Sequence, residues 1–407
     1  MADILEHIPS FGDLRASGAQ VSAFETAREE IAAAGDVPAA EIELGAVVRL
    51  DRGFPMIATA AGELLRAEHA VEFAKGKGKK RGGAGRGGAA GRGAAAGRAG
   101  RADRHAKRGG AAVPDAEVAT AAGVDGLLPS VGDFVAVRVS PSHDMGVILR
   151  VLPRETAFER WRGKNRGERQ VLAANVDVIF IVQPMGAERD TLQLMRDRVA
   201  RSLVLAHDCG AEPVVVLTKV DRCDAAEVAE AADDLRCLAG EGVRVIATSS
   251  RTGEGLDEVR ACIPQGSVGM ILGESGAGKS TLLNTLLGAD ALETSAVRER
   301  DDAGRHTTVA RIMVALPEPC GVIADCPGLR SLPLVGHERG LARSFPEVVE
   351  ASHACRFNDC THTHEPGCAV REGVESGEIA QVRLDAFLAL ASEMRVSAQS
   401  LDPDIHM

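Results

Sequence analysis

The sequence predicts a multidomain chain that combines a small β-barrel, a mostly parallel α/β domain and a short C-terminal helical segment. Short β-type runs bounded by Gly, Pro and Asp recur in residues 43–73 and 131–152, which is typical of a barrel. From Val171 onward, apolar strand-like runs alternate with helical patterns, which indicates a parallel sheet covered by helices. After about Leu329 the strand pattern stops, and Cys and His residues cluster.

Length and composition limit the class of protein. At about 150 residues per domain, 407 residues predict two or three domains. No apolar run approaches the roughly 18 residues of a membrane-spanning helix, and the N-terminus lacks a basic leader followed by an apolar stretch. Nine cysteines in such a chain are better explained as thiols and metal ligands than as disulfides. We therefore expect a cytoplasmic protein without membrane contacts.

The N-terminal third is expected to contain a leader, the barrel and a basic insertion. Residues 1–42 are polar and Ala-rich and are predicted to be a flexible leader with a short helix near 23–34. The barrel is expected at 43–157, interrupted at 75–126 by a Gly/Arg/Ala-rich tract. This tract has too few large apolar side chains to offset the entropy of ordering, so we expect it to be disordered.

Charge is distributed unevenly along the chain. Residues 75–108 carry twelve Lys or Arg and one acid, Asp103, so the net charge of −11 divides into +11 there and −22 elsewhere. Two interpretations of the tract stand: a solvated linker, or an arm that binds RNA phosphates. With ten Phe, one Trp and no Tyr, base stacking on aromatic side chains is a poor candidate for RNA contact.

The α/β domain is predicted from continuous apolar runs, which are typical of buried parallel strands. The expected strands are residues 176–182, 213–217, 243–247 and 268–272. Helical patterns at 192–206 and 225–238 fill the gaps, and a further helix is expected at 379–393.

A phosphate-binding loop is the strongest motif in the chain. It has the form G-x-x-x-x-G-K-S and lies between a strand that ends at Leu272 and a helical run, the context that this motif requires. The loop consists of Gly273, Glu274, Ser275, Gly276, Ala277, Gly278, Lys279 and Ser280, and Thr281 begins the helix. Its backbone N–H groups and Lys279 would bind the phosphates, and Ser280 would ligate Mg²⁺, so we predict nucleotide binding.

Asp325 and Gly328 are candidates for a second phosphate-side element. They occur as D-C-P-G after an apolar strand at 321–324. An Asp at a strand end is suited to Mg²⁺, and a Gly N–H can meet a γ-phosphate. The same four residues also form a common turn, and both interpretations stand.

Two further stretches are candidates for reading a guanine base. Thr218, Lys219 and Asp221 close the strand at 213–217, where a carboxylate can accept hydrogen bonds from guanine N1 and N2 while the Lys stem covers the base. The alternative is that Asp221 is only a helix N-cap. Ser249 and Ser250 end the next strand and offer backbone N–H groups to guanine O6, a weaker signal.

The order of these motifs points to a family. The T-K-V-D and S-S-R stretches precede the phosphate-binding loop, the reverse of the usual GTPase order, and a Cys/His cluster follows. Over roughly residues 44–395, apart from the basic tract, the chain resembles the circularly permuted, ribosome small-subunit-dependent GTPase A family (RsgA, also called YjeQ). Residues 129–135, 171–177 and 304–308 add to this resemblance.

The resemblance implies both an architecture and a function. The expected fold is an N-terminal OB-like β-barrel, a circularly permuted α/β P-loop GTPase domain at 171–330 and a helical zinc-binding module at 331–400. The chain would bind the small ribosomal subunit and its rRNA and assist late maturation. It would hydrolyse GTP to GDP slowly alone and faster on the subunit, and we expect a monomer.

The same family pattern implies one structural zinc ion. The spacing Cys-x4-Cys-x-His-x5-Cys assigns Cys355, Cys360, His362 and Cys368 as ligands, and three thiols with one imidazole suit tetrahedral Zn²⁺. His364 is a rival ligand, and His353 is a more remote one.

Hydrolysis is expected to depend on the switch loop. Leu329 stands where GTPases often have a water-orienting Gln, and its side chain cannot hydrogen-bond to water, so intrinsic hydrolysis should be slow. The resemblance suggests His306 as the catalytic residue, with contact to rRNA or solvent as the equal alternative. Thr308 is expected to join Ser280 and Asp325 as a Mg²⁺ ligand when GTP is bound.

Two other functions fit parts of the pattern. One is a P-loop ATPase or kinase, and Asp221 is evidence against it. The other is a non-enzymatic rRNA-binding scaffold with a structural nucleotide site, and Leu329 is evidence for it. The chain also departs from the family in its basic tract and in Thr218, which replaces the more usual Asn. We expect this replacement to remove a brace on the phosphate-binding loop and to make guanine affinity modest.

Overall fold

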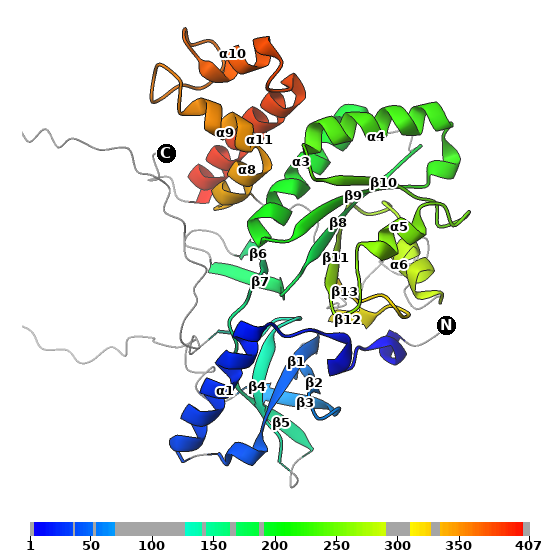
Figure 1. Ribbon diagram of the computed structural model, residues 1–407, viewed down its shortest axis with the longest axis vertical. Helices are drawn as coiled ribbons and strands as arrows, with labels where there is room; N and C mark the ends of the chain where they lie inside the picture. The colour runs from blue at the N-terminus through cyan, green and yellow to red at the C-terminus, as the bar shows by residue number, and fades with distance from the viewer. Residues whose placement is uncertain are drawn as a thin grey trace, which may run out of the picture.

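The computed structural model describes residues 4–35, 37–51, 54–69, 127–140, 144–162, 168–186, 191–289, 310–326 and 334–401. A barrel, an α/β domain and a helical module follow one another along the longest axis of the molecule (Figure 1). The basic tract predicted at 75–126 lies outside the described residues. No helix in the described ranges combines the length and the apolar character needed to cross a bilayer.

Five strands form the N-terminal barrel. They are β1 (Ile42–Leu50), β2 (Met56–Thr59), β3 (Leu64–His69), β4 (Phe134–Arg138) and β5 (Met145–Val151). Their order is β1-β2-β3-β5-β4, and β4 pairs back with β1 to close the barrel. Val47, Ile57, Val135 and Ile148 fill the interior. The predicted N-terminal barrel is therefore confirmed.

The leader differs from the flexible segment predicted at 1–42. It contains short 3-10 helices at Ile4–His7, Phe11–Asp13 and Ala39–Glu41, and helix α1 (Gly18–Ala33). Ser17 begins α1 with a capping box, in which its side chain accepts from Gln20 N and Gln20 Oε1 accepts from Ser17 N. Phe24 and Ala27 are buried where α1 packs on β4, so burial of this apolar stripe orders the segment.

The α/β domain has six strands in the order β10-β9-β8-β11-β13-β12. They are β8 (Val178–Pro184), β9 (Glu212–Thr218), β10 (Arg244–Ala247), β11 (Val268–Leu272), β12 (Arg311–Ala315) and β13 (Val322–Asp325). Neighbouring strands are parallel except that β12 is antiparallel to β13.

Helices cover both faces of this sheet (Figure 1). Helices α3 (Leu192–Cys209) and α4 (Ala225–Ala239) lie on one face, and α5 (Leu256–Ala261) and α6 (Lys279–Leu287) lie on the other. Along β8, Ile179 and Ile181 belong to the first core, whereas Phe180 and Val182 belong to the second. Because both faces of β8, β9 and β11 are buried over most of their length, these strands are apolar on both faces there, which is the pattern that predicted them.

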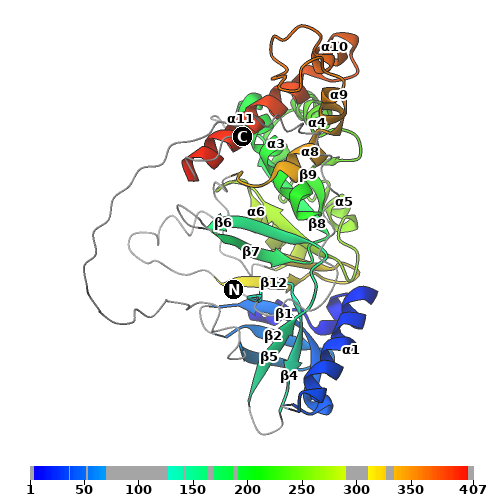
Figure 2. The ribbon, with the colours of Figure 1, turned by 90° about the vertical axis from the view of Figure 1, so that its left-hand side faces the viewer.

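Barrel and α/β domain share a continuous sheet that the sequence pattern did not predict. Strand β1 pairs with β12, with Arg49 opposite Ile312, and this pairing joins the two parts into eleven strands. A separate hairpin, β6 (Ala157–Arg162) and β7 (Glu168–Ala174), lies between the barrel and the C-terminal helices (Figure 2).

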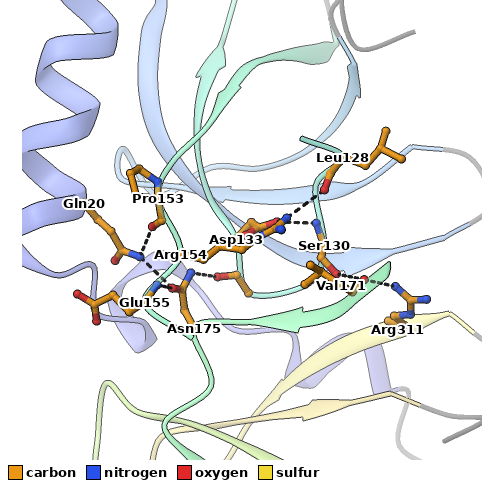
Figure 3. A network of polar contacts seen from close by, with 11 residues as sticks. Gln20, Leu128, Ser130, Asp133, Pro153, Arg154, Glu155, Val171, Asn175 and Arg311 are labelled. Carbon is orange, nitrogen blue, oxygen red and sulfur yellow. Dashed lines mark hydrogen bonds and ion pairs between the residues drawn. The ribbon is translucent and has the colours of Figure 1, made fainter. Parts of the chain in front are cut away.

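A buried polar network holds leader, barrel and connecting segment together (Figure 3). Asp133, which is fully buried, accepts from Arg154 Nε at 2.6 Å and Nη2 at 2.7 Å. Burial raises the pKa of Asp133, and the Arg154 guanidinium opposes that rise. Asn175 donates to Gly132 O at 2.8 Å, and its Oδ1 accepts from Gln20 Nε2 at 3.0 Å.

Gly132 lets the two stretches that carry this network approach closely. Its φ is +87°, and a Cβ atom there would lie 2.1 Å from Ala174 O. Ser130 Oγ also donates to Val171 O at 3.1 Å. Residues 129–135 and 171–177, which both contributed to the family resemblance, therefore meet in space.

The C-terminal module has four helices in the described residues, of which α8 and α11 pack on α3 and α11 also packs on α4 (Figure 1). They are α8 (Glu338–Ser344), α9 (Pro346–Ser352), α10 (Ala369–Ser376) and α11 (Gln381–Leu401). Arg383 anchors them, because its guanidinium donates to Glu347, to Leu238 O at 2.6 Å and to Ser344 O at 2.7 Å. Leu238 belongs to α4, so this one side chain ties the module to the α/β domain.

Replacing Arg383→Ala should loosen this junction. The Glu347 carboxylate and two carbonyls would lose a buried donor, which costs about 2–3 kcal/mol of local opening free energy. Hydrogen–deuterium exchange of peptides from α9 and α11 measures this local opening free energy. The control is Arg371→Ala, which removes an exposed pair with Glu375 at 3.8 Å and should change protection by less than about 0.5 kcal/mol. Equal protection of α11 in both variants would contradict the anchoring role.

Candidate nucleotide-binding site and metal centre

The phosphate-binding loop forms the turn between β11 and α6, as its motif predicted. Gly273 has a φ of +155°, and a Cβ atom there would lie 2.6 Å from Val182 O of the neighbouring strand, so only glycine fits without displacement. Lys279 folds over the loop and donates from Nζ to Gly273 O at 2.7 Å and to Glu274 O at 2.6 Å. The ammonium group is thus held where phosphates would be cradled.

Other parts of the loop are in place for a ligand. Ser280 and Thr281 occupy the first turn of α6, where the helix dipole favours an anion. Glu274 is paired with Arg198 of α3 at 2.8 Å, a contact that no pattern in the sequence predicts. Asp325 ends β13, which is parallel to β11, so its carboxylate lies at the same edge of the sheet as the loop.

Thr218 and Lys219 join the end of β9 to the phosphate-binding loop. Thr218 Oγ1 donates to Ala277 O at 2.7 Å, and Lys219 Nζ donates to Gly276 O at 2.6 Å. Lys219 has a left-handed φ of 60°, which turns the chain away from the strand. The expectation that Thr218 removes the brace was wrong, because its hydroxyl reaches the loop from a buried position.

Asp221 and Ser249 meet at the same edge, from the ends of β9 and β10. Ser249 Oγ donates to Asp221 Oδ1 at 2.7 Å, and Arg251 Nε donates to Asp221 Oδ2 at 2.7 Å. These hydrogen bonds, first from Ser249 and then from Arg251, hold the pKa of Asp221 below its ordinary value, so the carboxylate is ionised at neutral pH. Ser250 lies in the turn that follows Ser249.

The structure therefore brings three predicted stretches together: residues 218–221, 249–250 and 273–281. Arg251 was not predicted as a functional residue, and its only sequence signal is its position next to the two serines. His306, Thr308, Gly328 and Leu329 lie outside the described residues.

A second candidate site is the Cys/His cluster of the C-terminal module. One ligand atom from each of Cys355, Cys360, His362 and Cys368 lies within 4.8 Å of the others. Cys355 Sγ is 3.9 Å from Cys368 Sγ, and His362 Nδ1 is 3.6 Å and 3.5 Å from these sulfurs. A tetrahedron with metal–sulfur bonds of about 2.3 Å has edges of about 3.8 Å, so the set fits a four-coordinate ion.

The rival histidine is directed elsewhere. His364 Nδ1 is 2.8 Å from Thr363 Oγ1 and is not part of the cluster. Glu365 shapes the loop by accepting from the backbone N–H groups of Thr361, Thr363 and His364. The loop thus places His362, not His364, beside the three thiols.

Comparisons with known proteins agree with this geometry. Residues 151–335 match a family model described as RsgA GTPase. A protein of Streptomyces avermitilis named "Small ribosomal subunit biogenesis GTPase RsgA" is 44% identical over 263 residues, 64% of this chain and 68% of its own length. A protein of Methanosarcina acetivorans with the same name is 36% identical over 287 residues, 69% of this chain and 75% of its own.

Solved structures show the same fold. The crystal structure of YjeQ from Thermotoga maritima superposes with a TM-score of 0.58 at 21% identity, covering 87% of this chain and 99% of that one. The structure of YloQ, described as a circularly permuted GTPase, gives a TM-score of 0.54 at 20% identity, covering 87% and 96%.

The brace made by Thr218 is open to a direct test. Thr218→Val keeps the side-chain shape but leaves the buried Ala277 carbonyl without this donor, so it should lower the free energy of unfolding by about 1–2 kcal/mol. Thermal unfolding reports the change. The control is Thr285→Val on α6, whose hydroxyl donates only along its own helix to Thr281 O at 2.8 Å. If both valine variants unfold at the same temperature, the Thr218 bond does not support the loop.

Proposed function

Since the chain belongs to the RsgA GTPase family, we propose that it binds the small ribosomal subunit during late maturation and hydrolyses GTP there. Hydrolysis of GTP to GDP and phosphate is slow alone and faster on the subunit. One observation carries the proposal: a phosphate-binding loop, an ionised Asp221 and Ser249 converge at one edge of a parallel sheet. We further propose a monomeric, cytoplasmic protein.

The guanine side of the site follows from Asp221. Its carboxylate accepts from N1–H and N2–H of guanine, and adenine presents neither donor. Lys219 and Thr218 hold this corner against the phosphate-binding loop through Gly276 O and Ala277 O. Ser249 and Ser250 offer backbone N–H groups to the base oxygen.

The phosphate side is assigned to the loop and the elements beside it. The residues proposed to bind phosphate are Gly273, Glu274, Ser275, Gly276, Ala277, Gly278, Lys279, Ser280, Thr281 and Gly328. Lys279 would exchange its bonds with the loop carbonyls for bonds with phosphate oxygens. Ser280, Thr308 and Asp325 would hold Mg²⁺, which neutralises charge on the β- and γ-phosphates. His306 is proposed to position the attacking water or to stabilise charge as the reaction proceeds.

Nucleotide state is proposed to reach the ribosome-binding parts through the C-terminal module. Residues 326–337 connect β13, which carries Asp325, to α8. The start of α8 is fixed to α3, because His337 Nδ1 is 2.7 Å from Asp208 Oδ2 and Gly340 N donates to Asp208 Oδ1. Contacts with a γ-phosphate in the connecting segment would oppose these bonds, so the module's orientation would depend on which nucleotide is bound. Barrel and module act as a clamp that grips the subunit with GTP and releases it with GDP.

The cluster of three thiols and His362 is proposed to hold one structural zinc ion. The interatomic distances fit that ion, and a tetrahedral set without an open position suits a structural role. Zinc would tie the loop at 355–368 to α10, whose N-cap is the ligand Cys368. For the basic tract at 75–108 we propose contact with rRNA phosphates.

The decisive experiment is phosphate release from GTP and from ATP, with and without purified small subunits. We expect turnover of GTP, not ATP, to rise about 10²-fold on the subunit, the scale of one positioned catalytic group. Turnover without stimulation would remove the ribosomal assignment. Equal use of ATP would indicate a general P-loop ATPase, and no turnover under any condition would favour a scaffold.

A matched pair of variants tests the base-reading role in the same assay. Asp221→Asn removes an ionised acceptor, which should weaken GTP binding about 10- to 100-fold and leave the low ATP activity unchanged. Asp257→Asn changes an Asp whose side chain is 98% exposed on α5, and it should behave like the wild type. Equal GTP affinity in both variants would exclude Asp221 as the guanine acceptor.

Metal content tests the zinc proposal. Wild type and Cys237→Ala, which removes an exposed thiol outside the cluster, should each hold about one zinc per chain. Cys360→Ala should lose the ion, and hydrogen exchange across 355–376 should rise because the loop loses a ligand that holds it together. Zinc retained at full occupancy by Cys360→Ala would contradict the ligand set.

A further inference from the structure

Both oxygens of the Asp221 carboxylate accept hydrogen bonds from the protein itself. Oδ1 accepts from Ser249 Oγ, and Oδ2 accepts from Arg251 Nε, each at 2.7 Å. The Asp221 side chain is only 12% exposed, so access to it is limited. Each oxygen can accept a second hydrogen bond, but the exposed Arg251 guanidinium is bonded to Oδ2 of this largely covered carboxylate, so guanine and Arg251 compete for the approach to Oδ2.

The two partners differ in how firmly they are held. Ser249 is fully buried, and its Oγ also accepts from the backbone N–H groups of Arg251 and Thr252 at 3.2 Å. The Ser249 hydroxyl is thus part of the turn after β10. The Arg251 side chain is 73% exposed, and Asp221 is the partner that the structure gives its guanidinium.

We propose that Arg251 is a gate residue of the guanine site: its guanidinium is bonded to Asp221 Oδ2 and leaves when guanine enters. This inference rests on the proposed guanine recognition by Asp221. Lys219 does not serve this purpose in the structure, because its ammonium group is bonded to Gly276 O at 2.6 Å.

The exchange has a physical consequence for affinity and for base choice. Entry of guanine breaks an exposed ion pair, and the N1–H and N2–H donors replace the bond that Asp221 loses. A base without these donors would break the same pair and leave the carboxylate with no replacement. The gate therefore lowers guanine affinity modestly and disfavours adenine. Because the pair is largely exposed on the Arg251 side, salt should weaken it.

Calorimetric titration of the full chain with GDP tests the gate at low and high ionic strength. Arg251→Ala and Arg251→Gln should bind GDP about two- to fivefold more tightly than wild type at low ionic strength, which equals about 0.4–1 kcal/mol. This advantage should shrink at high ionic strength, where the ion pair is already screened.

Arg244→Ala is the matched control. Arg244 forms an exposed pair with Glu212 at 2.9 Å, also between β9 and β10 but at the opposite edge of the sheet. Its removal changes net charge equally and should leave GDP affinity at the wild-type value.

The outcomes separate the gate from the proposed function. If GDP binds wild type and Arg251→Ala with equal affinity, the gate is wrong and guanine recognition stands. Weaker binding by Arg251→Ala would show that the guanidinium stays and contacts the nucleotide, which also overturns the gate. If none of the four proteins binds GDP, guanine recognition fails and the gate fails with it.

Discussion

The nucleotide site depends on the register of buried parallel strands. Strand β8 pairs with β11 on one side and β9 on the other, so the carboxyl ends of all three strands reach the same edge. Gly273 follows β11, Thr218 ends β9 and Asp221 lies shortly after it, so the phosphate-binding loop and Asp221 lie at one edge because the strands are in register. A shift of register by one residue would also exchange the two apolar faces of β8, so core packing and site geometry are coupled.

The rest of the molecule is attached to that sheet by polar contacts as well as by apolar packing. The barrel continues the sheet through β1 and β12, and the buried Asp133–Arg154 pair lies where leader, barrel and connecting segment meet. At the other end, Arg383 and Asp208 bind the C-terminal module to α3 and α4. Buried charged groups need correctly placed partners, so these junctions favour one relative arrangement of the three parts.

The candidate nucleotide site of this acidic protein is formed by groups that are already bonded to one another. Two hydrogen-bond donors keep Asp221 ionised. The Lys279 ammonium group donates to carbonyls of its own loop, and Arg198 forms an ion pair with Glu274 of the same loop. Because Lys279 and Arg198 already have partners within the protein, nucleotide binding would exchange existing bonds for new ones. Exchange of this kind favours ligands whose donors and charges match the partners that they replace.

The sequence by itself determined the elements whose signals are local. The motif at 273–280, the apolar runs of the parallel strands and the Cys/His spacing each lie within a short stretch, and the barrel and the nucleotide fold are confirmed by the structure and its relatives. Only the tertiary structure decided that α1 is docked, that β1 pairs with β12, that Thr218 braces the loop and that Arg251 covers Asp221. These features join residues far apart in the chain or depend on side-chain direction. Periodicity and spacing predict neither long-range contacts nor side-chain direction, because they describe neighbours along the sequence and not neighbours in space.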